Sequence, residues 1–283
     1  MTVLTTRSSH RCFDGQQIYL EHESTVIGLP MRFSVFLPPV CTGEKPEKRP
    51  ILFYLAGLTC NEETFMIKAG AQRLAAELGL ILVSPDTSPR GANIDGDNSH
   101  WDFGVGAGFY LDATQSPWST HYRMESYITS ELLPLVLAQF PADARRVGIF
   151  GHSMGGHGAI TLALKHPDKF HSVSAFAPIA APMDCPWGHK AFAGYLGDNR
   201  SAWAAHDSCA LIAAGKRCPP LLVDQGLADQ FLAEQLSTDK LESTCQAAGQ
   251  SLQLRRHAGY DHGYYFISSF MADHLAHHAK HLV

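Results

Sequence analysis

The stretch that decides the fold is Val147-Gly148-Ile149-Phe150-Gly151-His152-Ser153-Met154-Gly155, followed by a helical pattern over 156–166. A short apolar run that leads through Gly-x-Ser-x-Gly into a helix is the context of a nucleophile elbow. Such an elbow holds its serine in a strained conformation, and side chains at Gly151 and Gly155 would clash with nearby backbone. The helix N-terminus beneath the serine also favours developing negative charge. We therefore interpret Ser153 as a nucleophile rather than as an incidental serine in a glycine-rich turn.

Working outward from this turn, short apolar runs alternate with helical spacing along most of the chain. Strands are expected at 51–56, 80–83, 146–150, 171–176, 221–224 and 251–256, and helices at 65–78, 122–140 with a kink at Pro134, 154–166, 231–248 and 264–281. Alternation of this kind predicts an α/β fold with a mostly parallel central sheet and helices on both faces. Two alternating runs at 16–23 and 31–37 predict an antiparallel N-terminal edge. No composition break divides the chain, so we expect a single domain over 1–283.

The composition bounds the function. The 283 residues are 45% hydrophobic and 17% charged, which excludes a disordered chain. The net charge of −5 argues against nucleic acid or an anionic membrane as the partner. The longest apolar run, 51–56, is far shorter than the ~20 residues that cross a bilayer. The polar first 15 residues predict no signal peptide, and seven cysteines without a Cys-x-x-Cys pair favour reduced thiols in the cytosol.

A serine nucleophile needs a base and an orienting acid, which in this fold follow it in the order acid, then histidine. Asp229 lies in the loop after the strand at 221–224 and is favoured as the acid. Asp224 is the alternative, but it ends the strand itself, where a structural role accepting loop N–H groups is expected. His262 lies between two glycines in the loop after 251–256 and is favoured as the base over His257.

The remaining candidate residues surround the elbow. His152 and His157 flank the serine in sequence, and the elbow geometry predicts packing roles for both. The oxyanion hole should use the backbone N–H groups of Met154 and Leu58, since Leu58 lies in the loop after 51–56. Cys60 lies beside that loop, either as an inert buried thiol or as a thiol whose alkylation blocks the site.

Two patterns resemble metal sites without meeting their requirements. Histidines recur at helical spacing near the C-terminus, at His274, His277, His278 and His281. A solvated terminal helix explains them better than a metal site, which needs partners that fix its geometry. Acidic residues at 95, 97 and 102 lack the Gly and Glu of an EF-hand loop. We expect no metal.

The residues together resemble the S-formylglutathione hydrolases, or esterase D family, over about 11–270. The blocks that carry the resemblance are 55–60 (LAGLTC), 101–110 (WDFGVGAGFY), 117–118, 122–124, 151–158 (GHSMGGHG), 185–188 (CPWG), 194–197 (GYLG), 224–226 with Asp229, and 259–262 (GYDH). Two departures are Gly263, where the family usually has serine, and Ala181-Pro182, where it often has Asn-Pro.

The resemblance implies an α/β-hydrolase fold, a triad of Ser153, Asp229 and His262, and hydrolysis of S-formylglutathione to glutathione and formate in cytoplasmic formaldehyde detoxification. It implies no cofactor and often a homodimer. A formyl group has no side chain, so we expect a small acyl pocket narrowed by Trp101 and Phe103, or by Trp187, unless these aromatic residues only pack in the core. A broad carboxylesterase or acyltransferase, and a non-catalytic binding module, are the alternative functions.

Overall fold

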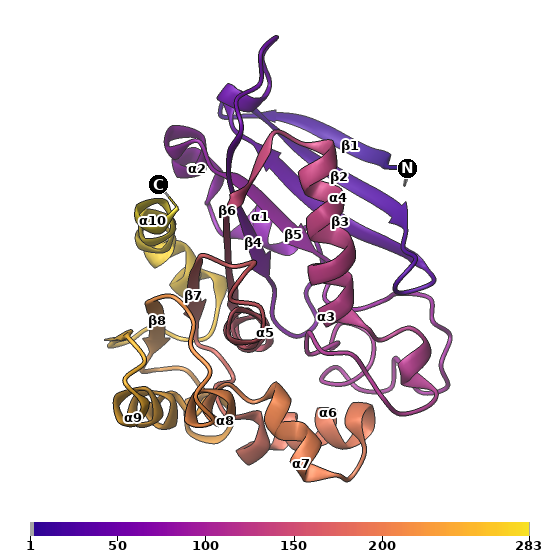
Figure 1. The fold of residues 1–283 in the computed structure, drawn as a ribbon, viewed down its shortest axis with the longest axis vertical. Coiled ribbons are helices and arrows are strands. Elements are labelled where there is room, and N and C mark those ends of the chain that lie inside the picture. Colours follow the sequence, from indigo (N-terminus) through magenta and orange to yellow (C-terminus); the bar gives the residue numbers. More distant parts are fainter. Residues whose placement is uncertain (1–2, 283) are drawn as a thin grey trace.

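A nine-stranded sheet forms the centre of the molecule in the computed structural model, which describes residues 3–282 (Figure 1). The strand order is β1-β2-β3-β5-β4-β6-β7-β8-β9. The strands are β1 (Thr5–Cys12), β2 (Gly15–Glu23), β3 (Pro30–Leu37), β4 (Arg49–Leu55), β5 (Ile81–Pro85), β6 (Ala142–His152), β7 (Ser172–Phe176), β8 (Leu221–Gly226) and β9 (Leu252–His257). From β5 across to β9 all neighbours are parallel, whereas β1, β2 and β3 form an antiparallel edge. The predicted mostly parallel sheet with an antiparallel N-terminal edge is confirmed.

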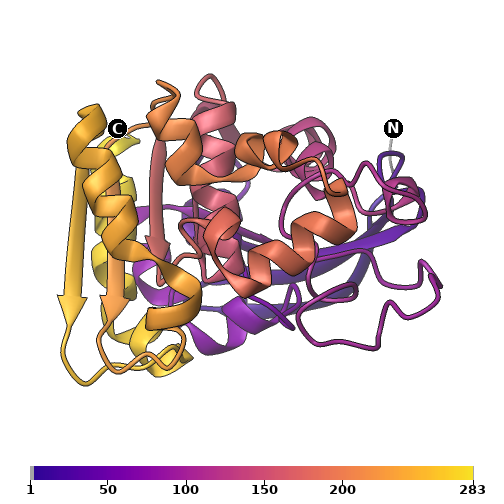
Figure 2. The same cartoon turned by 90° about the horizontal axis from the view of Figure 1, so that it is seen from below.

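Helices cover both faces of the sheet, as the alternation predicted (Figures 1 and 2). One face carries α10 (Tyr264–His281), which packs against β7, β8 and α2 (Gln72–Leu78). The other carries α4 (Leu133–Gln139) and α5 (Met154–Lys165), and α5 contacts β4, β6 and β7. The remaining α-helices are α1 (Thr64–Lys68), α3 (Met124–Ser126), α6 (Pro186–Leu196), α7 (Arg200–Trp203), α8 (Ser208–Ala213) and α9 (Thr238–Ala248).

Several expected elements differ from those observed. Strand β1 was not predicted, because its sequence TTRSSHRC lies at the sheet edge and has no apolar alternation. The helix expected at 65–78 is two helices, α1 and α2, separated at Gly70, whose φ of 68° is left-handed. The helix expected at 231–248 is broken at Ser237, also left-handed, after a π-helical segment at Leu232–Leu236.

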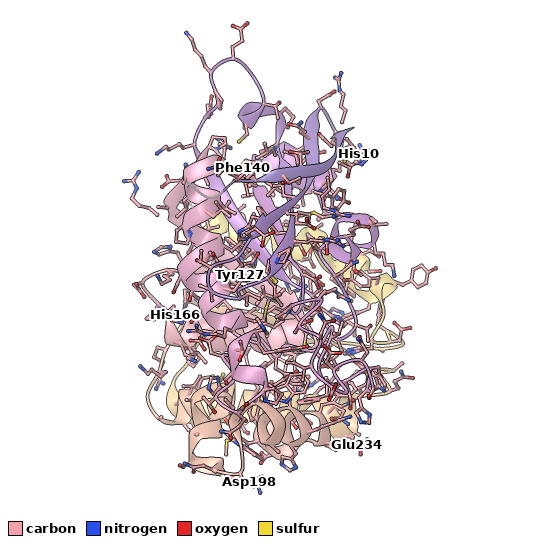
Figure 3. All side chains as sticks on the ribbon, turned by 90° about the vertical axis from the view of Figure 1, so that its right-hand side faces the viewer. His10, Tyr127, Phe140, His166, Asp198 and Glu234 are labelled. Atoms are coloured by element: carbon pink, nitrogen blue, oxygen red, sulfur yellow. The ribbon has the colours of Figure 1, made fainter. Side chains whose placement is uncertain are left out.

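The helix expected at 122–140 is continuous but locally widened. It runs from α3 through a π-helical segment, Tyr127–Leu132, into α4. Pro134 has no N–H to donate back along the helix, which accounts for an irregular turn just before it. At the outer end of α5, His166 (labelled in Figure 3) lies 2.9 Å through Nε2 from Glu125 of α3, and this contact joins the two helices.

The C-terminal helix is not a solvated helix on all sides, which corrects the expectation for two of its histidines. His274 and His278 are completely buried, and Nε2 of His274 lies 3.3 Å from Oδ2 of Asp224 in β8. Ser172 and Ser174 lie 2.7 and 2.9 Å from the two ring nitrogens of His278, and Ser174 lies 2.8 Å from Nδ1 of His274. Two neutral imidazoles satisfy every contact in this chain, with one donor and one acceptor on each ring.

Candidate active site

Ser153 is at the tip of a sharp turn between β6 and α5. Its backbone has φ 58° and ψ −119°, a strained region for a residue with a side chain. The turn is held from below, since the Ser153 N–H donates to Phe176 O at 3.0 Å and the Ser153 carbonyl accepts from His157 and Ile179. Backbone bonds to β7 and to the segment beyond it therefore keep the strained conformation in place.

The two glycines of the turn are required by close backbone contacts, as expected. A Cβ on Gly155 would lie 1.9 Å from Leu55 O, and one on Gly151 would lie 2.3 Å from Gly155 O. Neither oxygen is the end of a flexible side chain that could move aside. Close approach of α5 to the end of β4 therefore depends on both glycines.

His262 and Asp229 come together at the carboxyl ends of β8 and β9. Nδ1 of His262 lies 2.5 Å from Oδ2 of Asp229. The carboxylate is itself oriented, because it accepts the Phe231 backbone N–H at 2.8 Å and the Gln225 amide at 3.2 Å. The Asp229 side chain is fully buried and the His262 side chain is 15% exposed. An imidazole held through Nδ1 has its Nε2 free to act on a proton.

The alternative acid and base are engaged elsewhere. Asp224 is fully buried and binds the Arg255 guanidinium at 2.6 and 2.5 Å, with His274 at 3.3 Å and His257 at 3.2 Å. Burial alone would raise the pKa of Asp224, but hydrogen bonds from His274 and Arg255 hold the pKa well below its usual value. The structural role predicted for Asp224 is thus supported, although its partners are side chains rather than the loop N–H groups expected.

Of the two histidines beside the serine, one contacts the candidate base. The His152 ring centroid lies 4.4 Å from that of His262, and both of its buried nitrogens lack a hydrogen-bond partner among residues 3–282. Burial, and then the neighbouring His262, lower the pKa of His152 well below its usual value. His157 packs against Phe109 and Phe192 instead, and burial lowers its pKa to about 3.

The two residues expected to supply the oxyanion donors, Leu58 and Met154, both lie next to Ser153. Met154 is the first residue of α5, so its N–H has no acceptor within the helix. Leu58 lines the same cavity as Ser153, and its N–H donates to no backbone carbonyl within residues 3–282. Gly57 brings the two segments together, because a Cβ there would lie 3.2 Å from the Ser153 Cβ.

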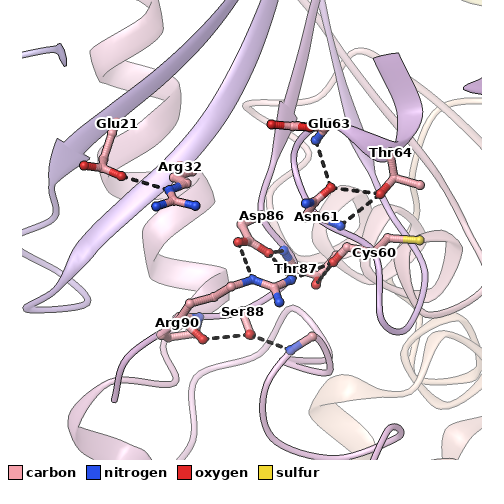
Figure 4. A network of polar contacts seen from close by, with 12 residues as sticks. Glu21, Arg32, Cys60, Asn61, Glu63, Thr64, Asp86, Thr87, Ser88 and Arg90 are labelled. Atoms are coloured by element: carbon pink, nitrogen blue, oxygen red, sulfur yellow. Dashed lines mark hydrogen bonds and ion pairs between the residues drawn. The ribbon is translucent and has the colours of Figure 1, made fainter. Parts of the chain in front are cut away.

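A polar network holds the segment that carries Leu58 (Figure 4). The Cys60 carbonyl accepts from Thr87 Oγ1 at 2.6 Å and from Arg90 at 3.0 Å, and Asp86 in turn binds Arg90 at 2.7 and 2.9 Å. The Thr59 N–H donates to Gly106 O at 2.9 Å. The long segment that follows β5 therefore holds the candidate oxyanion loop in place.

A small cavity of about 130 Å³ surrounds the serine. Its lining residues are Gly57, Leu58, Cys60, Trp101, His152, Ser153, Trp187, Phe231, His262 and Tyr264. Trp187 is buried and meets Trp101 edge-on at 5.5 Å, whereas Trp101 is 56% exposed and lies at the rim. Phe103, also considered for the pocket, instead stacks on Tyr195 at 4.6 Å and packs against Trp118.

Two lining residues were missed in the sequence. Phe231 packs edge-on against the His262 ring at 5.0 Å, and Tyr264 lies 6.2 Å from the His152 ring. Each follows a candidate site residue by two positions, Asp229 and His262 respectively. Sequence proximity was the only signal that could have found them.

Cys60 lines the cavity. Its thiol is free, as are those of the other six cysteines. Burial raises its pKa above the usual value, against weaker opposing contacts from Thr64 and Tyr264. At neutral pH the thiol is therefore protonated, and less nucleophilic than an exposed cysteine.

Neither metal clusters nor membrane spans are found over residues 3–282. That part of the chain contains no group of three or more His, Cys, Asp or Glu side chains placed to hold a metal ion. It also contains no helix long and apolar enough to cross a membrane.

Comparison with known proteins gives consistent results. The family model named Esterase matches residues 24–277. The S-formylglutathione hydrolase of Mus musculus is 51% identical over 278 residues, which are 97% of each chain, and that of Rattus norvegicus is 50% identical over the same span. A solved S-formylglutathione hydrolase from Agrobacterium tumefaciens superposes with a TM-score of 0.96 at 47% identity, covering 99% of this chain and 100% of that one. The chain belongs to the esterase family with the α/β-hydrolase fold, in its S-formylglutathione hydrolase branch.

Proposed function

We propose that the protein hydrolyses S-formylglutathione to glutathione and formate, with Ser153, His262 and Asp229 as its catalytic triad. The observation that carries the proposal is the 2.5 Å contact between His262 Nδ1 and Asp229, made in a cavity that Ser153 shares with His262. The two rodent S-formylglutathione hydrolases, about half identical to this chain over nearly its whole length, support S-formylglutathione as the substrate.

In the first half-reaction, the Ser153 hydroxyl attacks the formyl carbon while His262 Nε2 takes its proton. Asp229 stabilises the imidazolium that forms, and it stays ionised. The backbone N–H groups of Leu58 and Met154 bind the oxyanion of the tetrahedral intermediate. The C–S bond then breaks and glutathione leaves as a thiolate, and the proton held on His262 passes to that thiolate or to solvent, so the imidazole is neutral again before the second half-reaction.

In the second half-reaction, water attacks the formyl-enzyme. His262 takes a proton from the water, the oxyanion donors hold the second tetrahedral intermediate, and Ser153 leaves with the proton returned by His262. Formate is released and the free serine is restored. No cofactor enters either step.

The size of the cavity favours a small acyl group. A volume of about 130 Å³ is below the ~300–1,000 Å³ of pockets that enclose drug-sized ligands. We place the formyl group there, with Cys60, Trp101 and Trp187 as walls. We also propose that the protein is a single domain that assembles as a homodimer. It would act in the cytoplasm, in formaldehyde detoxification.

The test compares acyl groups on one thiol. Rates with S-formyl-, S-acetyl- and S-butyrylglutathione are each divided by the rate of alkaline hydrolysis of the same compound, which removes intrinsic reactivity. We expect the corrected kcat/KM to fall about tenfold or more per step, since one added methylene in a closed pocket shifts discrimination by ~1–3 kcal/mol. A flat corrected series, with p-nitrophenyl acetate turned over equally well, would instead identify a general esterase or acyltransferase.

A further inference from the structure

The cavity around Ser153 leaves most of the proposed substrate unaccounted for. At about 130 Å³ it accommodates the acyl group and the thioester sulfur, but not a tripeptide. Glutathione adds two carboxylates and one ammonium group, and so carries a net negative charge at neutral pH. The protein itself has a net charge of −5, so binding of this anion needs a local cation near the cavity mouth.

A second hollow adjoins the cavity and supplies such a cation. It measures about 470 Å³ and is lined by Lys68, Tyr264, Tyr265 and Ser268. Tyr264 lines both spaces, so the two are adjacent. Lys68 ends α1, and the other three residues lie in the first turns of α10. Figure 2 shows these two helices on the same face of the sheet.

The Lys68 ammonium is available for a ligand. Its Nζ lies 5.8 Å from the centroid of the Tyr264 ring, and the side chain is exposed. Lys165, Lys190 and Lys240 each pair with a carboxylate, whereas Lys68 has no carboxylate within salt-bridge distance among residues 3–282. An ammonium group that lies beside an aromatic face and has no acidic partner can bind a carboxylate without breaking an existing ion pair.

The wall of the hollow also suits the peptide part of the ligand. Tyr265 is a large side chain that is 87% exposed, and a ligand in the hollow would cover part of it. The glycine of glutathione directly follows the cysteine that carries the thioester sulfur, and its carboxylate lies about 7 Å from that sulfur when the peptide is extended. This length is greater than the 5.8 Å between Lys68 Nζ and the centroid of the Tyr264 ring, which borders the cavity of Ser153.

We propose that the hollow beside Tyr264 is the subsite for the glutathionyl group, with Lys68 binding one of its carboxylates. This inference rests on the proposed function and names the residue that selects an anionic thiol carrier over a neutral one. Lys68 touches neither the acyl group nor the reacting atoms, so it determines affinity rather than the rate of the chemical step.

The experiment uses the whole purified protein and the variants Lys68→Met, Lys68→Arg and Lys68→Glu. Lys216→Met is the matched control, because Lys216 is exposed and precedes β8, near the amino ends of the parallel strands, whereas the elbow lies at their carboxyl ends. Substrates are S-formylglutathione and the neutral S-formyl-N-acetylcysteamine. We expect Lys68→Met to raise KM for the glutathione thioester about fivefold with kcat within twofold, and to leave the neutral thioester unchanged.

The remaining variants and the salt dependence sharpen the result. Lys68→Arg should stay close to wild type, and Lys68→Glu should raise KM further, to about 20-fold. The gap between wild type and Lys68→Met should narrow from 0.05 to 0.5 M salt, because the contact is partly exposed and screened. A change equal to that of Lys216→Met, or an equal change with the neutral thioester, would refute the subsite.

A second readout separates this proposal from the proposed function. S-methylglutathione, a thioether that cannot be hydrolysed, is titrated as an inhibitor of p-nitrophenyl acetate hydrolysis. Competitive inhibition that weakens about fivefold in Lys68→Met supports the subsite even if S-formylglutathione proves a poor substrate. Absence of inhibition in the wild-type protein rejects the subsite, whether or not the thioester is turned over.

Discussion

Replacing Asp229 and Asp224 by asparagine, one at a time, should separate catalysis from stability. Both carboxylates are buried near the carboxyl end of β8, and each lies close to at least one histidine. Asparagine keeps the shape of either side chain and removes its charge. The two variants therefore differ only in which contacts lose that charge.

In Asp229→Asn, His262 loses its contact with a charged carboxylate. The carboxylate accepts the Nδ1–H of His262 at 2.5 Å, which leaves Nε2 free to take the serine proton. An amide NH₂ in its place donates to Nδ1 and moves the ring proton to Nε2, the wrong tautomer for a base. We expect kcat to fall by ~10⁴. The Phe231 N–H at 2.8 Å can still bond to the amide oxygen, but the Gln225 amide loses its acceptor, so stability should fall by about 1 kcal/mol.

In Asp224→Asn, Arg255 loses its buried ion-pair partner. Breaking a fully buried ion pair costs ~3–5 kcal/mol. The Arg255 side chain is 27% exposed and keeps Asp273 at 2.7 Å, so we reduce the estimate to about 2–3 kcal/mol. For a domain of this size that corresponds to a fall in Tm of about 3–5 °C. Activity per folded molecule should change less than threefold.

The assay measures kcat with a saturating thioester at a temperature where both variants are folded, together with Tm by calorimetry and far-ultraviolet circular dichroism. The reasoning is refuted if Asp224→Asn proves the more damaging to kcat in folded protein. It is equally refuted if Asp229→Asn keeps activity within tenfold of wild type.

Three further outcomes are expected. Ser153→Ala should lower kcat by ~10⁶ with an unchanged Tm, and residual activity within tenfold of wild type would exclude Ser153 as the nucleophile. Gly155→Ala should give little folded protein, as judged by expression and circular dichroism, because its Cβ would lie 1.9 Å from Leu55 O; normal stability would show that the elbow can shift. Stability should fall as the pH drops below ~6.5, because burial lowers the pKa of five buried histidines, His22, His152, His157, His274 and His278, and the unfolded chain then binds more protons than the folded one. At pH 5.5 the loss should be about 4 kcal/mol from His152, His157 and His278 together, whose pKa is lowered furthest, and smaller from the other two. A denaturant titration series from pH 8 to 5 that shows no loss of stability would contradict this.

Local sequence determined the architecture wherever burial imposes a pattern. Strands β4, β5, β7 and β8 and the second half of β6 are apolar because both faces of a parallel sheet are covered there, and each strand from β4 to β9 was found within a few residues of its bounds. The elbow could also be predicted from the sequence, because its motif requires a strand before it and a helix after it. The structure shows why Gly155 is needed there, since a Cβ would overlap Leu55 O. Asp229 and His262 were chosen from chain order and loop position, and the structure brings them to 2.5 Å.

Contacts between distant segments decided what local patterns could not. Strand β1 has no apolar alternation, so only its pairing with β2 makes it a strand. His274 and His278 look the same in sequence as the partly exposed His277, but their faces of α10 meet Ser172, Ser174 and Asp224.

The walls of the cavity depend on tertiary structure in the same way. Phe231, Tyr264, Trp187 and the supports of Leu58 come from segments up to about 200 residues apart, and no period or motif records which of them meet. A sequence states which residue types can do the chemistry and which turns can hold them. The fold decides which side chains share a cavity, because burial and hydrogen bonding there depend on neighbours that the chain supplies from elsewhere.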